Sequence, residues 1–245
     1  MMDFQTAKTV YEQPPPVYHE PKVIVETQPE IRTLAPPPEV EQKQVKPEIH
    51  RPRIHHRDKI IHLIALNRSI SGNMRGIRGA DLMCYQQARQ AGFKTTFRAF
   101  ISSRVQDLLQ IVHREDRDTP VVNIRGEKLF EDWASVFTQT SMPSNVPIYS
   151  FTYRDVLQGD EWPDKYIWHG SDEQGLRTDG FYCEDWRSSS GFAHGMASAL
   201  LRGRPLITDA EKISCRRELI VLCVENMSKF NVNRLLRGKQ RKFRY

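Results

Sequence analysis

The chain has 245 residues, and its 36 Lys and Arg against 30 Asp and Glu give a formal net charge of +6. It contains no run of about 18 apolar residues, so we expect no membrane-spanning helix, and residues 1–10 lack the apolar core of a signal peptide. No Gly-X-Y repeat is present, which excludes a collagen triple helix from this stretch. The motifs Gly-x-Ser-x-Gly, Gly-x-x-x-x-Gly-Lys and His-Glu-x-x-His are also missing, which argues against the enzyme classes that carry them.

Composition divides the chain into three parts. Residues 1–53 contain ten of the 15 prolines, no glycine and no sustained apolar periodicity, which predicts a disordered, Pro-rich hinge. Residues 54–228 carry 22 basic and 22 acidic residues, and they are numerous enough to form one buried core. Residues 229–245 contain seven basic residues and no acid, so the excess positive charge lies in this basic C-terminal tail.

Hydrophobic periodicity predicts short strands mixed with a few helices. A strand at 60–67 is followed by a glycine-rich loop at 71–79, and a helix then runs from Ala80 to Gly92 with Leu82, Tyr85 and Ala88 on its apolar face. Further helices are predicted at 105–113, 133–137 and 154–157, and further strands at 97–101, 119–124, 148–151, 166–168 and 218–225. The strands do not alternate with helices as βαβ units do, so the predicted fold class is α+β.

Four cysteines are present, at Cys84, Cys183, Cys215 and Cys223, and none forms a Cys-x-x-Cys pair. An even number without metal-type spacing fits two disulfides and an oxidising compartment. Four reduced thiols in a cytosolic protein are the alternative. The residues alone leave all three possible pairings open.

Four motifs occur in unbroken order along residues 55–228: Met74-Arg-Gly-Ile-Arg-Gly-Ala-Asp81, Trp168-His-Gly-Ser-Asp172, Tyr182-Cys-Glu-Asp-Trp-Arg187 and Ile220-Val-Leu-Cys-Val-Glu-Asn226. This stretch resembles the endostatin family, the C-terminal domain of type XV and XVIII collagens. The resemblance implies a compact α+β domain with a mixed twisted sheet, similar to C-type lectin domains, and the disulfides Cys84–Cys223 and Cys183–Cys215. It also implies a non-catalytic, secreted domain of the extracellular matrix, whose signal peptide and collagenous region lie outside this sequence.

The resemblance further implies binding of heparan sulfate or heparin, matrix proteins and cell-surface receptors, within a parent collagen trimer. Regulation of cell migration or angiogenesis belongs to the same expectation. Arginines at five positions match those associated with heparan sulfate in the family: Arg75, Arg78, Arg98, Arg114 and Arg187. The planar guanidinium group suits bidentate contact with sulfate. The alternative is that some are ordinary surface arginines, or that Arg98 pairs with a buried carboxylate.

A zinc site in this family uses three histidines and an aspartate. These positions fall on Ile54, His56, His62 and Gly126, so the candidate metal ligands are His56 and His62, with His55 and Glu127 as substitutes. A closed structural zinc site takes four ligands. We therefore expect weak or absent zinc binding and no required cofactor.

Two other functions remain open at this stage. The basic tail is typical of a nucleic-acid-binding arm, which makes a nucleic-acid-binding module the first alternative. A hydrolase centred on His169 and Ser171 is the second, although Asp172 is typical of a turn. Sequons for N-glycosylation start at Asn67 and Asn226.

Overall fold

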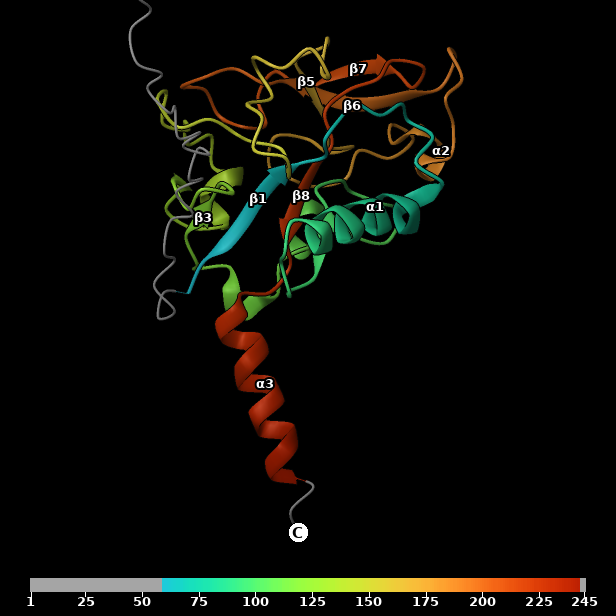
Figure 1. The fold of residues 1–245 in the computed structure, drawn as a ribbon. Helices are drawn as coiled ribbons and strands as arrows, with labels where there is room; N and C mark the ends of the chain where they lie inside the picture. The colour runs from blue at the N-terminus through green and yellow to red at the C-terminus, as the bar shows by residue number, and fades with distance from the viewer. Residues whose placement is uncertain (1–58, 243–245) are drawn as a thin grey trace, which may run out of the picture. The chain divides into compact units, whose positions relative to one another are not determined.

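A computed structural model describes residues 59–242 and the side chains of residues 59–236 (Figure 1). The predicted hinge at 1–53 lies outside the described residues, which all belong to one compact unit. Two sheets form its framework, one of five strands in the order β2-β8-β1-β3-β4 and one of three strands in the order β5-β6-β7. No helix between residues 59 and 242 is long and apolar enough to cross a membrane.

The central strand of the larger sheet is β1 (Ile61–Ala65), in which every residue is buried. It runs parallel to β3 (Val121–Val122) and antiparallel to β8 (Leu222–Glu225), and β2 (Phe97–Ala99) and β4 (Lys128–Phe130) complete the sheet. A strand covered on both faces needs a continuous apolar run rather than alternation. The predicted run at 60–67 is therefore confirmed as the central strand.

The smaller sheet is antiparallel and consists of β5 (Tyr166–Trp168), β6 (His194–Ala199) and β7 (Glu211–Ser214). It joins the larger sheet through the segment before β8, where the Trp168 N–H donates to the Ile220 carbonyl at 3.0 Å. Only β5 of these three strands was predicted. The other two consist largely of small or polar residues, so neither has an apolar run to mark it.

The long helix α1 (Gly76–Gln90) lies beside β2 and β8 (Figure 1). Its buried side consists of Gly76, Ala80, Cys84 and Ala88, one residue in every four, so the backbone approaches the sheet closely. The prediction was wrong on two points. The helix begins four residues before Ala80, inside the expected glycine loop, and Leu82 and Tyr85 are 52% and 41% exposed.

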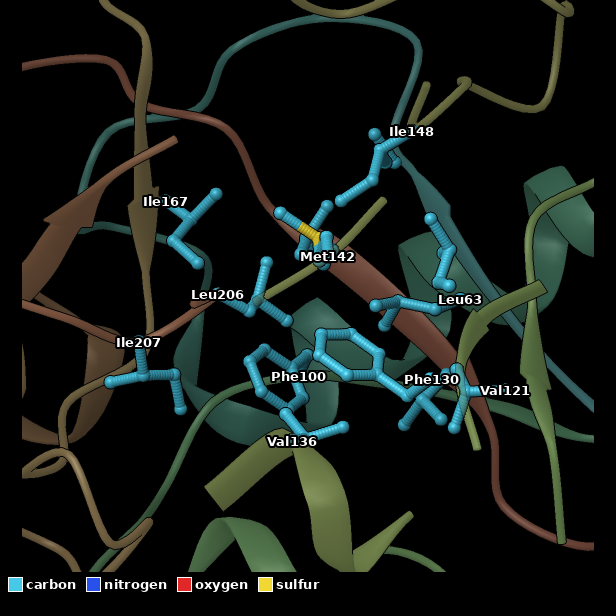
Figure 2. Close-up of a cluster of buried hydrophobic side chains, with 14 of the residues drawn as sticks. Leu63, Phe100, Val121, Phe130, Val136, Met142, Ile148, Ile167, Leu206 and Ile207 are labelled. Carbon is cyan, nitrogen blue, oxygen red and sulfur yellow. The ribbon is translucent and has the colours of Figure 1, made fainter. Parts of the chain in front are cut away.

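Buried apolar side chains form two clusters, one of which lies beneath α1. In the other, side chains from both sheets and from the connecting loops point toward one another (Figure 2). Phe100, Phe130, Ile167 and Leu206 are examples, drawn from four distant parts of the sequence. The predicted compact α+β class is confirmed by this arrangement.

Three predicted elements are absent or shorter. The helix expected at 105–113 is only the 3-10 turn η1 (Leu108–Gln110), and Val105 is 80% exposed. Nearby polar side chains engage the backbone instead, as when Asp107 accepts from the Arg177 N–H at 3.0 Å, and such bonds compete with helix formation. Residues 154–157 form a turn, and 148–151 supply isolated bridges at Tyr149 and Ser150.

The remaining elements are short turns and a C-terminal helix. The turns are η2 (Arg114–Asp116), η3 (Ala134–Phe137) and α2 (Cys183–Trp186). The expected helix at 133–137 corresponds to η3. Helix α3 (Lys229–Lys242) occupies the predicted basic tail, for which no element was expected.

Candidate functional site

Exposed arginine side chains surround the first turn of α1. Arg75 occupies the N-cap position with φ of 61°, makes no side-chain capping bond, and donates its own N–H to Asn73 Oδ1 at 3.3 Å. The first turn of the helix contains no acidic residue. Such an end presents backbone N–H groups and the positive end of the helix dipole, which together favour an anion.

The α2 turn brings a third arginine to the same place. The Met74 N–H donates to the Trp186 carbonyl at 2.9 Å, and Asn73 forms a β-bridge with Arg187. A Cβ added to Gly76, whose φ is +78°, would lie 3.0 Å from the Arg187 guanidinium carbon. The guanidinium group therefore lies directly over the start of α1. We call Arg75, Arg78 and Arg187 the α1 arginine cluster.

The α2 turn that positions Arg187 is left-handed. Its four residues have φ between 49° and 59°, which costs about 1–2 kcal/mol for each L-residue. Three interactions hold it: the Cys183–Cys215 disulfide, a bond of 2.7 Å from Trp186 Nε1 to the Ser102 carbonyl, and the packing of Trp186 against Trp168. Arg187 thus follows a turn that is held in place by the buried side chains of Cys183 and Trp186.

The charges of the α1 arginine cluster are not neutralised. Several other domain arginines have acidic partners, as in Arg217 with Asp164 at 2.9 Å and Arg177 with Asp179 at 3.4 Å. The nearby Asp185 is itself 3.8 Å from Arg104. Within residues 59–236, no member of the cluster forms an ion pair. Three exposed positive charges therefore remain available to an external anion.

The other two predicted arginines lie apart from this cluster. Arg98 is half-buried in β2, and its positive charge attracts the carboxylate of Asp81 in α1. Burial raises the pKa of the Asp81 carboxyl, while the bond from the Ala99 N–H and the charge of Arg98 partly offset that rise. Arg114 is exposed in η2, whose next two residues contact α3. The structure thus brings together three of the five.

A family model described as "Collagenase NC10 and Endostatin" matches residues 61–229, about two thirds of the chain. The chain belongs to the endostatin family. It is 50% identical over 176 residues to the human collagen alpha-1(XVIII) chain, which covers 70% of this chain and 10% of that relative. The chain therefore spans about a tenth of the relative's length, and it corresponds to the endostatin domain of a collagen XVIII-like protein.

Both disulfides implied by the resemblance are present in this endostatin domain. Cys84 of α1 is joined to Cys223 of β8 with a Cα–Cα separation of 5.5 Å, and Cys183 to Cys215 with one of 5.6 Å. The four sulfur atoms lie in the fully buried core. Gly72 is part of the same packing, because a Cβ there would lie 2.4 Å from Cys183 Sγ.

The described residues of the endostatin domain do not by themselves complete a zinc site. His62 is 5% exposed, its Nδ1 lies 2.7 Å from Glu225 Oε2, and its Nε2 has no hydrogen-bond partner among the described residues. Glu127 accepts a bond of 2.7 Å from Asn123 Nδ2, and Gly126 offers no ligand. His56 lies outside the described residues, and residues 59–242 contain no group of three possible ligands.

The structure argues against the hydrolase alternative. His169 and Ser171 are both fully buried, and the His169 ring contacts Ser171 Oγ at 3.0 Å and Ser198 Oγ at 3.1 Å. Burial lowers the pKa of His169 to about 3. Asp172 accepts the backbone N–H groups of Gln174 and Leu176, as expected for a turn. A substrate has no access to a nucleophile in this position.

The two sequons differ in accessibility. Asn226 is 8% exposed and is followed by the fully buried Ser228, which bonds to Asp116, so a glycan at this site is incompatible with the fold. Asn67 is half-buried and its Oδ1 accepts the Thr152 N–H at 3.0 Å.

Two features of the arginine site could not be predicted from the sequence. These are the close approach of Arg187 to Gly76 and the left-handed turn that precedes Arg187. The close spacing of Gly72 and Gly76 was the one visible signal in the sequence.

Proposed function

We propose that this endostatin domain is a non-catalytic, secreted component of the extracellular matrix that binds heparan sulfate through the α1 arginine cluster. Its further partners are matrix proteins and cell-surface receptors, and its parent is a collagen trimer. The observation that carries the proposal is the cluster itself: three exposed, unpaired arginines around an uncapped helix start. Control of cell migration or angiogenesis would follow from this binding, which requires no cofactor.

Local arrangement, rather than total charge, supports the proposed binding. Residues 54–228 have 22 basic and 22 acidic residues, so the domain has no net attraction for a polyanion. Sulfate groups spaced along a glycan can each meet one guanidinium group and an open N–H of α1. Exposed contacts of this kind are screened by salt, so the affinity should fall steeply as ionic strength rises.

The test is elution from immobilised heparin over a salt gradient. The double variant Arg75→Ala/Arg78→Ala should elute at clearly lower salt, with affinity reduced about tenfold or more, because two charge-assisted contacts are lost. The matched control is Arg177→Ala/Arg204→Ala, which removes the same charge from exposed arginines that already pair with Asp179 and Asp209. This control should elute close to the unmodified chain.

Deletion of residues 229–245 separates the cluster from the basic tail. The deletion should lower affinity less than the double variant does, because the tail contributes screened attraction of charge alone. If only the deletion shifts elution, the arginine-cluster proposal is wrong. The tail would then be the polyanion-binding element, and the nucleic-acid alternative would gain support.

A further inference from the structure

Helix α3 lies beyond the endostatin family match, which ends at residue 229. It nevertheless begins from a well-ordered cap. Ser228 is fully buried, its Oγ accepts the Asn231 N–H at 3.3 Å, and its carbonyl accepts the Val232 N–H at 3.0 Å. A serine at the N-cap satisfies a backbone donor of the first turn. The helix is thus a structural continuation of β8.

A buried carboxylate fixes α3 to the domain. Asp116 of η2 is fully buried and accepts bonds from Ser228 N at 2.9 Å, Ser228 Oγ at 2.7 Å and Asn231 Nδ2 at 2.8 Å. Its neighbour Glu115 forms an ion pair with Arg234. A negative charge at this end also complements the helix dipole. These contacts all fall within residues 228–234, in the first turns of α3.

The two sides of α3 differ in chemistry. Val232, Leu235 and Leu236 follow the i, i+3, i+4 spacing of a single side, and Leu235 and Leu236 are 46% and 55% exposed. We call these three residues the α3 apolar stripe. The helical period of 3.6 places positions 234, 237 and 241 on the opposite side, and all three are arginine. The separation has two exceptions, since the same period places Lys239 on the stripe side and Phe230 on the arginine side. The helix contains six Lys and Arg and no acid.

Three kinds of partner can be compared by what they would cover. A glycan or nucleic-acid chain would neutralise the arginines but leave the leucines in water. A second copy of α3 would cover the leucines but bring two sets of like charges together. The surface of an anionic bilayer satisfies both sides, because acyl chains accept the leucines while headgroups pair with arginine.

We propose that α3 docks on anionic phospholipid surfaces that face the extracellular space, lying in the interface with the α3 apolar stripe inserted at the headgroup boundary. The binding is peripheral and reversible, since one short helix supplies only a few apolar side chains. This binding is independent of the proposed heparan sulfate binding, which uses the start of helix α1 and not α3. The charge complementarity of the arginines and the exposure of the leucines are the two observations behind it.

The test is co-sedimentation of the full chain with vesicles of phosphatidylcholine containing phosphatidylserine, and with vesicles of phosphatidylcholine alone. Binding is expected only to the anionic vesicles. Leu235→Ser/Leu236→Ser keeps every charge and should lower the partition coefficient about tenfold or more. Arg237→Gln/Arg241→Gln should lower it about 10- to 30-fold, as expected for two surface charges. The matched control Leu176→Ser/Leu201→Ser alters leucines of similar exposure elsewhere and should bind normally.

Three outcomes would overturn the proposal. One is no binding to anionic vesicles, and another is binding that the leucine substitutions leave unchanged, which would indicate attraction by charge alone. The third is a dimer in sedimentation equilibrium that the leucine substitutions abolish, which would assign the stripe to a second copy. Heparin elution provides an independent reading, because the leucine variant should elute with the unmodified chain whether or not the arginine cluster binds the glycan.

Discussion

Helices α1 and α3 share a basic character and the absence of acid in their first turns, yet they are held in different ways. Helix α1 buries a side made of glycine, alanine and cysteine and is joined covalently to β8. Between residues 229 and 236, helix α3 leaves its apolar side chains half-buried or exposed, and it is held at its base by hydrogen bonds to Asp116. One helix belongs to the core, and the other is an attachment to it.

This difference in attachment explains why each helix has large apolar side chains on its surface. In α1 the close approach to the sheet leaves room only for small residues, so Leu82 and the arginines remain on the surface. In α3 no element among residues 59–242 covers Leu235 and Leu236, so these two leucines are exposed for another reason. The same residue type thus reports close packing in one helix and a missing partner in the other. The following predictions test this distinction.

The largest effect is expected from removal of the α1 crosslink. Cys84→Ala/Cys223→Ala opens a loop with a sequence separation of 139, for which chain entropy predicts a loss of about 5 kcal/mol. Cys183→Ala/Cys215→Ala, with a separation of 32, should lose about 4 kcal/mol. Urea unfolding measures both. A loss below about 1 kcal/mol for the first pair would mean that packing alone holds α1.

The next effect concerns the base of α3. Asp116→Ala leaves the donors of Ser228 and Asn231 without an acceptor, which should cost about 2–4 kcal/mol. Hydrogen exchange should accelerate in α3 more than in α1, because the shortest bonds of Asp116 go to Ser228 and Asn231 at the start of α3, and its other contacts, with Lys59 and Thr119, do not involve α1. Asp118→Ala is the matched control, since its carboxylate is exposed and pairs with Lys59. Equal acceleration in both helices would contradict the separation between them.

Sequence patterns identified elements with strong apolar runs and missed those without them. A buried strand at β1, the strand β5 and the α+β class could be predicted because Ile61–Ala65 and Tyr166–Trp168 consist mostly of large apolar residues. Strand β6 could not be predicted, because its sequence His-Gly-Met-Ala-Ser-Ala contains only one large apolar residue, although neighbouring elements bury most of the strand. The predicted apolar side of α1 was right for Ala88 and wrong for Leu82 and Tyr85, because close packing against the sheet there requires small residues.

The candidate site was predictable in composition but not in geometry. Family motifs pointed to Arg75, Arg78 and Arg187, yet only the left-handed α2 turn explains how residues more than a hundred positions apart meet. Such a turn is rare for L-residues and has no sequence signature of its own. The anchoring of α3 depends on Asp116, which looks like an ordinary acidic surface residue until the fold buries it.

Acid offers a way to perturb the core that contains α1, through the buried His169. Because burial lowers the pKa of His169 to about 3, the unfolded chain binds a proton below about pH 6.5 that the folded chain does not. Stability should therefore fall as pH drops from about 6.5 toward 3, by at most about 1.4 kcal/mol per pH unit. Unfolding of His169→Gln should lack this share of the slope, and an unchanged slope would show that His169 is not buried in its neutral form.

The smallest effect is expected on the exposed side of α1. Leu82→Ser should change the free energy of unfolding by about 0.5 kcal/mol or less, as expected for a surface position. Ala88→Leu, two turns further along on the buried side, should cost about 1–3 kcal/mol because the added atoms have no space against the sheet. Leu82→Ser should also leave vesicle binding unaltered, in contrast to the leucine substitutions in α3. Thermal and urea unfolding measure the first two changes. A larger loss for Leu82→Ser than for Ala88→Leu would mean that Leu82 lies on the buried side of α1, as the sequence predicted. The contrast between the exposed leucine of α1 and those of α3 would then no longer hold.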